Sequence, residues 1–561
     1  MLGALMLLLT TLVACAEDKD TDTDQEKNEE AEAEKEEEAF DPEPNPDATQ
    51  ISTYDEGRMN DQAQINEDLL SEYEEGNYSF EDPFIKVDPY DAAPLTALAK
   101  FDTEEPVQIK VTVGGEEGQE PIEKTWEGYE TEHETPILGL YPDTENTVIL
   151  EATDEEGNTE TTEVSIATEA LPDDFLTTDL VEADTEKMED GLTFIIPSKE
   201  YIYAVDENAD VRWYSTLPIR HVFNRLENGN VLFMTKDKEE DQYNELLEMD
   251  LIGKVSNAYK VQIDGYDKHN LLHHDVIELP NGNLLATSHE PDSEYVQDQM
   301  NEIDRETGKT VQEINAKDFF PKEAYEEYDG KNADEGDWFH QNTIWFDETD
   351  NTILVSGRSQ DAIIKLSYPE AEIQWILAAH ENWPEDYEQY LLEPESDDVK
   401  FQTAQHAVKT LPDMDDNPDT LDVLLFDNNE VITRGDKDVS GDYSRAVQYR
   451  INEKEKTVDE VWSYGEERGK SFFSTIVGNT QYLYDTGNRL ITSGYIEPED
   501  DPDSRISKIV EVDDQDDAEV IYEITVSGFD EGSSRQAYRA VRIPLYPEEE
   551  WDFKLGDTET E

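Results

Sequence analysis

A short hairpin motif recurs along the second half of the chain, and this repeat restricts the fold more than any other feature. In each clear copy an apolar strand leads into a tight turn that ends in Gly-Asn, and a second apolar strand follows. The clearest copies are Leu226–Leu232, Leu279–Leu285 and Asp485–Ile491, and variants without the glycine lie at Asp347–Val355 and Leu411–Phe426. One hairpin repeated in this way predicts a repeat architecture.

A second recurring element alternates with this hairpin. It is an apolar strand, an acidic or glycine turn, and a strand that often closes on tryptophan. Its six copies are Tyr203–Trp213, Leu246–Val255, Glu302–Val311, Ile363–Trp375, Gln448–Trp462 and Ile509–Ile524. Six units of four short strands predict an all-β fold, a six-bladed β-propeller over residues 176–548, with Tyr538–Leu545 as its closing strand.

The segment before the propeller has the pattern of a smaller all-β domain. Val107, Ile109, Val111 and Val113 alternate with polar residues and lead into the Gly114-Gly115 turn. Further alternating segments follow, so we predict a small N-terminal β-sandwich over residues 80–175. No chemistry is expected there. Residues 549–561 are expected to form an acidic tail.

The first 79 residues predict export and attachment rather than a core. Residues 1–15 form an apolar run, too short to span a bilayer, that ends in Leu12-Val13-Ala14-Cys15. This ending resembles a lipoprotein-type signal, in which Cys15, the only cysteine, is lipidated. We therefore expect an exported cell-envelope lipoprotein that faces the extracytoplasmic side; an ordinary export signal with an incidental cysteine is the alternative. Residues 16–79 are expected to be an acidic disordered tether with a short helix near Asp61–Tyr73.

The charge of the chain excludes one class of partner. Asp and Glu number 140 against 42 Lys and Arg, which gives a formal net charge of −98. Because nucleic-acid binding depends on cations that neutralise phosphates, we expect no nucleic acid to bind. A solvated acidic surface is the expected explanation of this excess, and a role in collecting cations is the alternative.

Four histidines lie at the predicted start of the innermost strand of successive blades. His221 and His274 each precede their Gly-Asn turn by eight residues, and His340 and His406 precede the corresponding strands of the next two blades. The starts of these strands meet on one face of a propeller, so the four imidazoles should share a pocket. Nucleophilic catalysis and metal binding are both open to such a cluster, but the spacing follows no compact metal-ligand motif.

Two further polar residues are placed near the same pocket. Arg358 follows the strand that pairs with the one begun by His340, among small polar neighbours that suit an anion-binding guanidinium. Asn342, two residues after His340, should point to the same side of its strand. Together these groups would bind a tetrahedral anion.

At these residues the sequence resembles the bacterial aryl-sulfate sulfotransferases, the family that works without the nucleotide sulfate donor PAPS. The resemblance covers about residues 80–545. Its motifs are His273-His274-Asp275, Asp337-Trp338-Phe339-His340-Gln341-Asn342, Ser356-Gly357-Arg358, Gln405-His406, Ser444-Arg445 and Trp462–Gly469, with Ala93–Leu98 and Thr131–Pro142 in the sandwich.

The resemblance implies a ping-pong transfer of a sulfuryl group from a phenolic sulfate donor to a phenol acceptor through a sulfohistidine. It implies His406 as nucleophile and His274, His340, Asn342 and Arg358 as holders of the sulfuryl oxygens, with no cofactor or metal. A hydroxyl residue is expected near Ser474 and Thr475. His273 and His274 face opposite ways, and the register favours His274. A tendency to form homodimers is implied as well.

A non-catalytic, lipid-anchored propeller that only binds a partner, and a metal-dependent propeller hydrolase, are the competing hypotheses. His221 acquires no catalytic role from the resemblance.

Overall fold

The computed structural model describes most of the chain from residue 48 onwards. The ranges left out are 1–47, 116–119, 199–200, 237–241, 264–269, 292, 436, 438–440, 500, 502–503, 516–517, 530–535, 548–550, 552 and 556–561. The predicted signal, Cys15, the tether up to residue 47 and most of the acidic tail lie outside the described residues. From residue 41 onwards the chain forms one compact unit.

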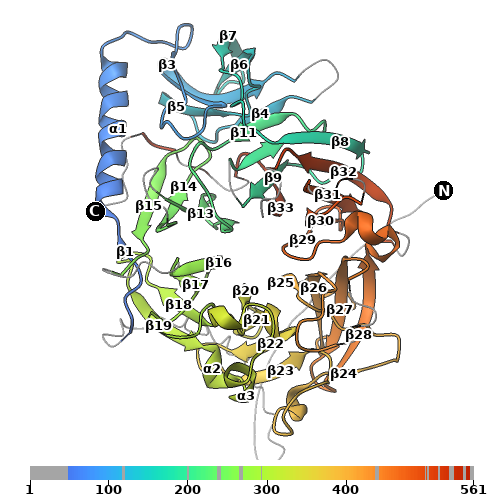
Figure 1. The fold of residues 1–561 in the computed structure, drawn as a ribbon. Coiled ribbons are helices and arrows are strands. Elements are labelled where there is room, and N and C mark those ends of the chain that lie inside the picture. The colour runs from blue at the N-terminus through green and yellow to red at the C-terminus, as the bar shows by residue number, and fades with distance from the viewer. Residues whose placement is uncertain are drawn as a thin grey trace, which may run out of the picture. The chain divides into compact units, whose positions relative to one another are not determined.

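Six antiparallel sheets follow one another as the blades of a propeller (Figure 1), as the repeat predicts. Blade 1 contains β33 (Ala537–Ile543), β9 (Leu192–Pro197), β10 (Tyr203–Val205) and β11 (Val211–Tyr214). Blade 2 contains β12 (Phe223–Arg225), β13 (Val231–Thr235), β14 (Glu245–Met249) and β15 (Val255–Lys260). Blade 3 contains β16 (Leu272–Glu278), β17 (Leu284–Ser288), β18 (Gln299–Ile303) and β19 (Thr310–Asn315).

The other three blades repeat the same order from the innermost to the outer strands. Blade 4 contains β20 (Gln341–Asp347), β21 (Thr352–Gly357), β22 (Ala362–Ser367) and β23 (Ile373–Leu377). Blade 5 contains β25 (His406–Thr410), β26 (Thr420–Asp427), β27 (Arg445–Asn452) and β28 (Thr457–Tyr464). Blade 6 contains β29 (Asn479–Tyr482), β30 (Arg489–Ile496), β31 (Ile506–Val512) and β32 (Val520–Ser527). Short helices lie in the connections: α2 (Ala316–Phe319), α3 (Glu323–Glu326), η1 (Ala333–Glu335), η2 (Arg358–Gln360), η3 (Glu388–Tyr390) and η4 (Glu466–Phe472).

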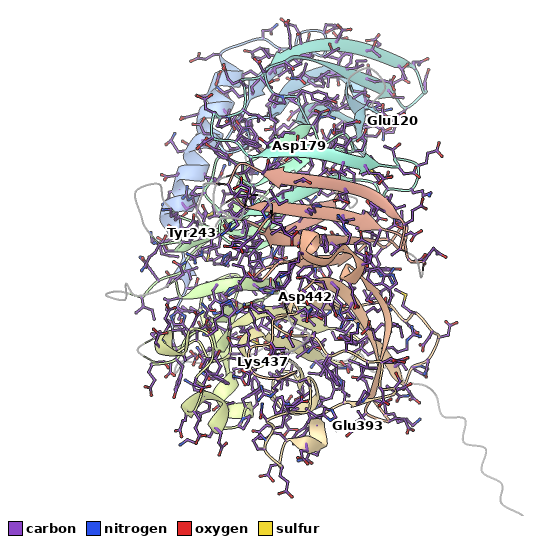
Figure 2. All side chains as sticks on the ribbon, turned by 45° about the vertical axis from the view of Figure 1, so that its right-hand side comes forward. Glu120, Asp179, Tyr243, Glu393, Lys437 and Asp442 are labelled. Carbon is purple, nitrogen blue, oxygen red and sulfur yellow. The ribbon has the colours of Figure 1, made fainter. Side chains whose placement is uncertain are left out.

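The ring is closed by strand pairing from both ends of the propeller sequence. β33, the predicted closing strand, pairs with β9 in blade 1, while β8 (Thr177–Ala183) pairs with β32 at the outer edge of blade 6. β24 (Glu393–Pro394) likewise extends blade 5. Figure 2 labels Asp179 on β8 and Glu393 on β24. Closure therefore rests on backbone hydrogen bonds in two different blades.

The N-terminal domain is a sandwich built around one long strand, β3 (Thr96–Val113). Its first half pairs with β2 (Phe84–Val87) and β5 (Glu130–Leu138), and its second half pairs with β4 (Ile122–Thr125) and β6 (Glu145–Asp154), beside which lies β7 (Thr159–Ala167). The pairing of β3 with β5 shifts register between Asp102 and Val107, near the point where β3 changes its other partner from β2 to β6. Buried apolar side chains from both halves form the core of the sandwich.

The segment before the sandwich packs more closely than its acidic composition indicates. Ile51 is fully buried, and β1 (Thr53–Tyr54) pairs with β15 at the outer edge of blade 2. The predicted helix is longer than expected, α1 (Glu56–Glu74), and Asp55 caps it by accepting a hydrogen bond from the Arg58 N–H. Phe553 and Leu555, in the predicted acidic tail, are also buried.

Candidate active site

The innermost strands of blades 2, 3 and 4 begin with an unusual backbone conformation. His221, His274 and His340 have φ angles of 59°, 31° and 52°, in the left-handed region that residues other than glycine rarely adopt. The pairing of β16 and of β20 shifts register beside these residues. Each such residue costs about 1–3 kcal/mol, and bulges of this kind re-aim side chains at functional sites.

The start of β25 differs in backbone conformation from the corresponding places in the three preceding blades. His406 is the first residue of β25 and is not left-handed, whereas Ala404 and Ala407, on either side of it, have φ angles of 49° and 57°. The backbone conformation that His221, His274 and His340 share therefore does not extend to His406.

The histidine rings of blades 2, 3 and 4 nevertheless form one cluster. The ring centroid of His274 lies 5.1 Å from that of His221 and 4.7 Å from that of His340. Tyr538, from β33, stacks on His221 with the centroids 4.4 Å apart. His406 lies within electrostatic reach of both His340 and His274. Five of the six blades thus bring side chains to one place.

The adjacent residues His273 and His274 make different contacts. His273 Nε2 lies 2.9 Å from the Ser288 carbonyl, so it must donate, and His273 Nδ1 then accepts from His274 Nδ1 at 2.9 Å. Burial lowers the pKa of His273 to about 3 and that of His274 well below its ordinary value. His274 lies in the cluster, whereas His273 contacts His274 through the hydrogen bond between their Nδ1 atoms and is held by the Ser288 carbonyl. With Nδ1 protonated, neutral His274 carries its lone pair on Nε2.

The orientation of His406 is set by Asn428, at the end of β26. The Asn428 amide nitrogen donates to the carbonyls of Ser474 and Val477, each at 2.8 Å, which turns its oxygen towards His406. That oxygen lies 2.6 Å from His406 Nδ1, so the ring nitrogen is the donor. Burial, and then the charge of Arg358, lower the pKa of His406 well below its ordinary value. His406 is therefore neutral, with its lone pair on Nε2.

His340 has a different partner. Its Nδ1 lies 2.7 Å from the Asp337 carboxylate, which also accepts a hydrogen bond from the Asn332 amide at 3.2 Å. Burial would raise the pKa of the Asp337 carboxyl, but attraction to His340 and these two hydrogen bonds outweigh burial and lower it. Asp337 is thus ionised next to His340.

Arg358 and Asn342 connect the two histidines. The Arg358 N–H donates to the His340 carbonyl at 3.2 Å, and its buried guanidinium donates to the Thr475 carbonyl at 3.4 Å. Asn342 donates to the carbonyl of Gln405 at 2.7 Å, directly before His406. Both predicted groups therefore lie beside His406, as part of the same network.

The two predicted hydroxyl residues have unequal surroundings. The Ser474 hydroxyl donates to the Ile476 carbonyl and accepts from the Tyr495 N–H, so it is occupied by the backbone. Thr475 lies beside Arg358 and is only half-buried. Of the two, Thr475 is better placed to meet a substrate.

The described residues form neither a metal centre nor a membrane-spanning helix. Among these residues, no group of three His, Cys, Asp or Glu side chains is arranged to hold a metal ion. No helix in this part of the chain is both long and apolar enough to cross a bilayer.

Comparison with known proteins places this cluster in a known family. Residues 177–539 match the arylsulfotransferase (ASST) family model, and residues 84–169 match the arylsulfotransferase Ig-like domain. Two curated relatives, both named arylsulfate sulfotransferase AssT, come from Lelliottia amnigena and Escherichia coli O6:H1 (strain CFT073). Each is 24% identical over 76% of this chain, and the matches cover 88% and 87% of the relatives. The chain therefore belongs to the arylsulfotransferase family of enzymes.

Proposed function

We propose that this enzyme moves a sulfuryl group from a phenolic sulfate ester to a phenol by a ping-pong mechanism, with a sulfohistidine on His406 as the intermediate. The observation that carries the proposal is the Asn428–His406 hydrogen bond, 2.6 Å long, which leaves the lone pair of a neutral ring on Nε2 beside Arg358. A neutral imidazole is a competent nucleophile.

In the first half-reaction, His406 Nε2 attacks sulfur as the bond between sulfur and the phenolic oxygen breaks. The products are an N-sulfonated His406, with its proton retained on Nδ1, and a phenolate that takes up a proton. In the second half-reaction an acceptor phenol loses its proton and attacks the same sulfur, which restores neutral His406. The proton that the leaving phenolate takes up in the first half-reaction is matched by the proton that the acceptor loses in the second, so the full cycle conserves charge and atoms.

The charge that spreads over the sulfuryl oxygens needs donors in fixed positions. Arg358 supplies a buried guanidinium, and Asn342 retains one amide N–H beyond the bond to Gln405. His274 completes this set in the proposal, and the free N–H of His340 serves the bridging phenolic oxygen. His274 can donate from Nε2 only after it gains a proton, which the negative sulfuryl group favours.

The experiment uses the purified full-length chain and 4-nitrophenyl sulfate. We expect nitrophenol release to accelerate when a phenol is added, with parallel double-reciprocal plots, and to be unaffected by a chelator. No release with any phenol would favour a binding module without catalytic activity. Loss of release on chelation would favour a metal-dependent hydrolase.

We also propose that Cys15 is lipidated and holds the enzyme at the extracytoplasmic face of the cell envelope. The Leu12-Val13-Ala14-Cys15 ending supports this proposal. Wild-type protein expressed in a bacterium should fractionate with membranes, and Cys15→Ala should release it in soluble form. Equal fractionation of the two would contradict the anchor.

The family resemblance supports a homodimer as the assembled form. Light scattering of purified protein should give twice the mass of one chain, and the mass of one chain would contradict it.

A further inference from the structure

The phenolate that leaves in the first half-reaction needs a proton, and the second half-reaction must remove one. Phenols have a pKa near 10, so an unassisted phenolate is a poor leaving group unless its ring carries a withdrawing substituent. A group that gives a proton in the first step and takes one in the second would serve both. His406 cannot be this group, because its two nitrogens are committed to Asn428 and to sulfur.

His340 has the surroundings that such a group requires. Its Nδ1 lies 2.7 Å from the Asp337 carboxylate, and only 3% of Asp337 is exposed. The second carboxylate oxygen, Oδ1, is buried with no hydrogen-bond partner among the described residues. The charge of Asp337 is therefore directed largely at the His340 ring. A carboxylate so placed stabilises the imidazolium that forms whenever the far nitrogen of the ring gains a proton.

The other charged and titratable groups that face His340 do not supply this charge. His221, His273 and His274 come from blades 2 and 3, and His406 comes from blade 5. Arg358 is a cation, held to His340 through the backbone. Tyr328, which interacts electrostatically with Asp337, has a raised pKa because of its burial and is neutral. Asp337 is thus the one anion in direct contact with the His340 ring in the described part of the site.

We propose that Asp337 is a positioning residue that holds His340 as the proton donor to the leaving phenolate and the proton acceptor from the incoming phenol. This inference rests on the proposed sulfuryl transfer. His340 begins as an imidazolium and gives its Nε2 proton to the phenolic oxygen as the bond from oxygen to sulfur breaks. It is then neutral and takes the proton of the acceptor phenol as that oxygen attacks sulfur, which returns it to the starting state.

The test compares donors whose leaving phenols differ in basicity. In a ping-pong reaction, kcat/KM for the donor reports only the first half-reaction, so it isolates the protonation of the leaving group. Asp337→Asn keeps the shape of the side chain and removes its charge. We expect about a 100-fold to 1000-fold loss of kcat/KM with phenyl sulfate, and less than about a 10-fold loss with 4-nitrophenyl sulfate, whose leaving group needs little help.

The matched control is Asp347→Asn, at the other end of β20, where a buried carboxylate caps a turn by accepting from the Thr349 N–H. In Asp347→Asn, kcat/KM should fall by the same factor with both donors, if it falls at all. Because each comparison is a ratio within one protein preparation, the fraction of folded enzyme cancels.

Equal losses with the two donors in Asp337→Asn, complete inactivity included, or no loss with either donor, would overturn the inference. If the wild-type chain does not transfer sulfuryl groups at all, the proposed function itself fails, and that outcome is visible before any variant is made.

Discussion

The two histidines at the inner edges of blades 4 and 5 have nearly the same Nδ1 contact and opposite electrostatic surroundings. His406 Nδ1 lies 2.6 Å from an amide oxygen, and His340 Nδ1 lies 2.7 Å from a carboxylate. The neutral partner fixes a tautomer without adding charge, whereas the anionic partner stabilises a protonated ring. In the proposed mechanism, equivalent blades thus provide one imidazole that attacks sulfur and another that carries a proton.

His221 lies at the corresponding position of blade 2 but lacks a hydrogen-bond partner for its Nδ1 atom among the described residues. His221 stacks on Tyr538, and its Nδ1 is buried with no hydrogen-bond partner in the described structure. Burial, followed by the charges of Arg220 and Arg539, lowers its pKa well below the ordinary value. His221 is therefore a packed, neutral ring at one end of the histidine cluster.

The largest effect should follow removal of the nucleophile. His406→Ala should lower kcat by at least about 10⁴-fold, because the covalent route is lost while the anion-binding groups remain. Steady-state release of nitrophenol measures this loss. Activity within about tenfold of the wild type would assign the nucleophile elsewhere.

Replacing Asn428 by aspartate should give His406 an anionic Nδ1 partner, like the one that His340 has. In Asn428→Asp a carboxylate faces Nδ1 and raises the pKa of His406, so the neutral fraction falls as the pH falls. Single-turnover release from 4-nitrophenyl sulfate should drop about 100-fold at pH 6 and recover as the pH rises. Wild-type His406 has a pKa well below 6.5 and should add no acid limb between pH 6 and 8. Superimposable pH–rate profiles for the wild type and Asn428→Asp would contradict the contrast between His406 and His340.

A smaller loss is expected when the charge of Arg358 is kept and its planar fork is removed. Arg358→Lys should lower the single-turnover rate about 30-fold, since an ammonium cannot make two parallel hydrogen bonds to sulfuryl oxygens. Stopped-flow absorbance measures the rate. An unchanged rate would mean that the guanidinium acts only as a point charge.

The smallest effect concerns the histidine without a polar partner. His221→Phe keeps the stack on Tyr538 and should leave kcat/KM within about threefold of the wild type. A loss as large as that of Arg358→Lys would give His221 a direct role in the chemistry.

The repeat could be predicted because its turns depend on residue type. Gly229, Gly282 and Gly487 adopt φ angles of 82°, 81° and 79°, which glycine permits at little cost, so the motif marks each hairpin. The strand pairs that follow depend on apolar alternation, which is also visible in the sequence. These two signals sufficed for the propeller.

The partners of the histidines carry no comparable signal. Asn428 follows β26 in an ordinary Asp-Asn-Asn stretch, and its role depends on carbonyls of Ser474 and Val477, which come from the next blade. Asp337 was visible in the family motif, but only its distance to His340 gives it a role. The backbone conformation around His406 could not be predicted either, because left-handed alanines at positions 404 and 407 have no signature in residue type.

The central claim is that His406 Nε2 bonds to sulfur during turnover. Wild-type enzyme mixed with 4-nitrophenyl sulfate and no acceptor should gain the mass of one SO₃ unit on the peptide that contains His406. Added phenol should discharge this label, and His406→Ala should show none. A label on another residue, or turnover at the wild-type rate without any label, would contradict the account.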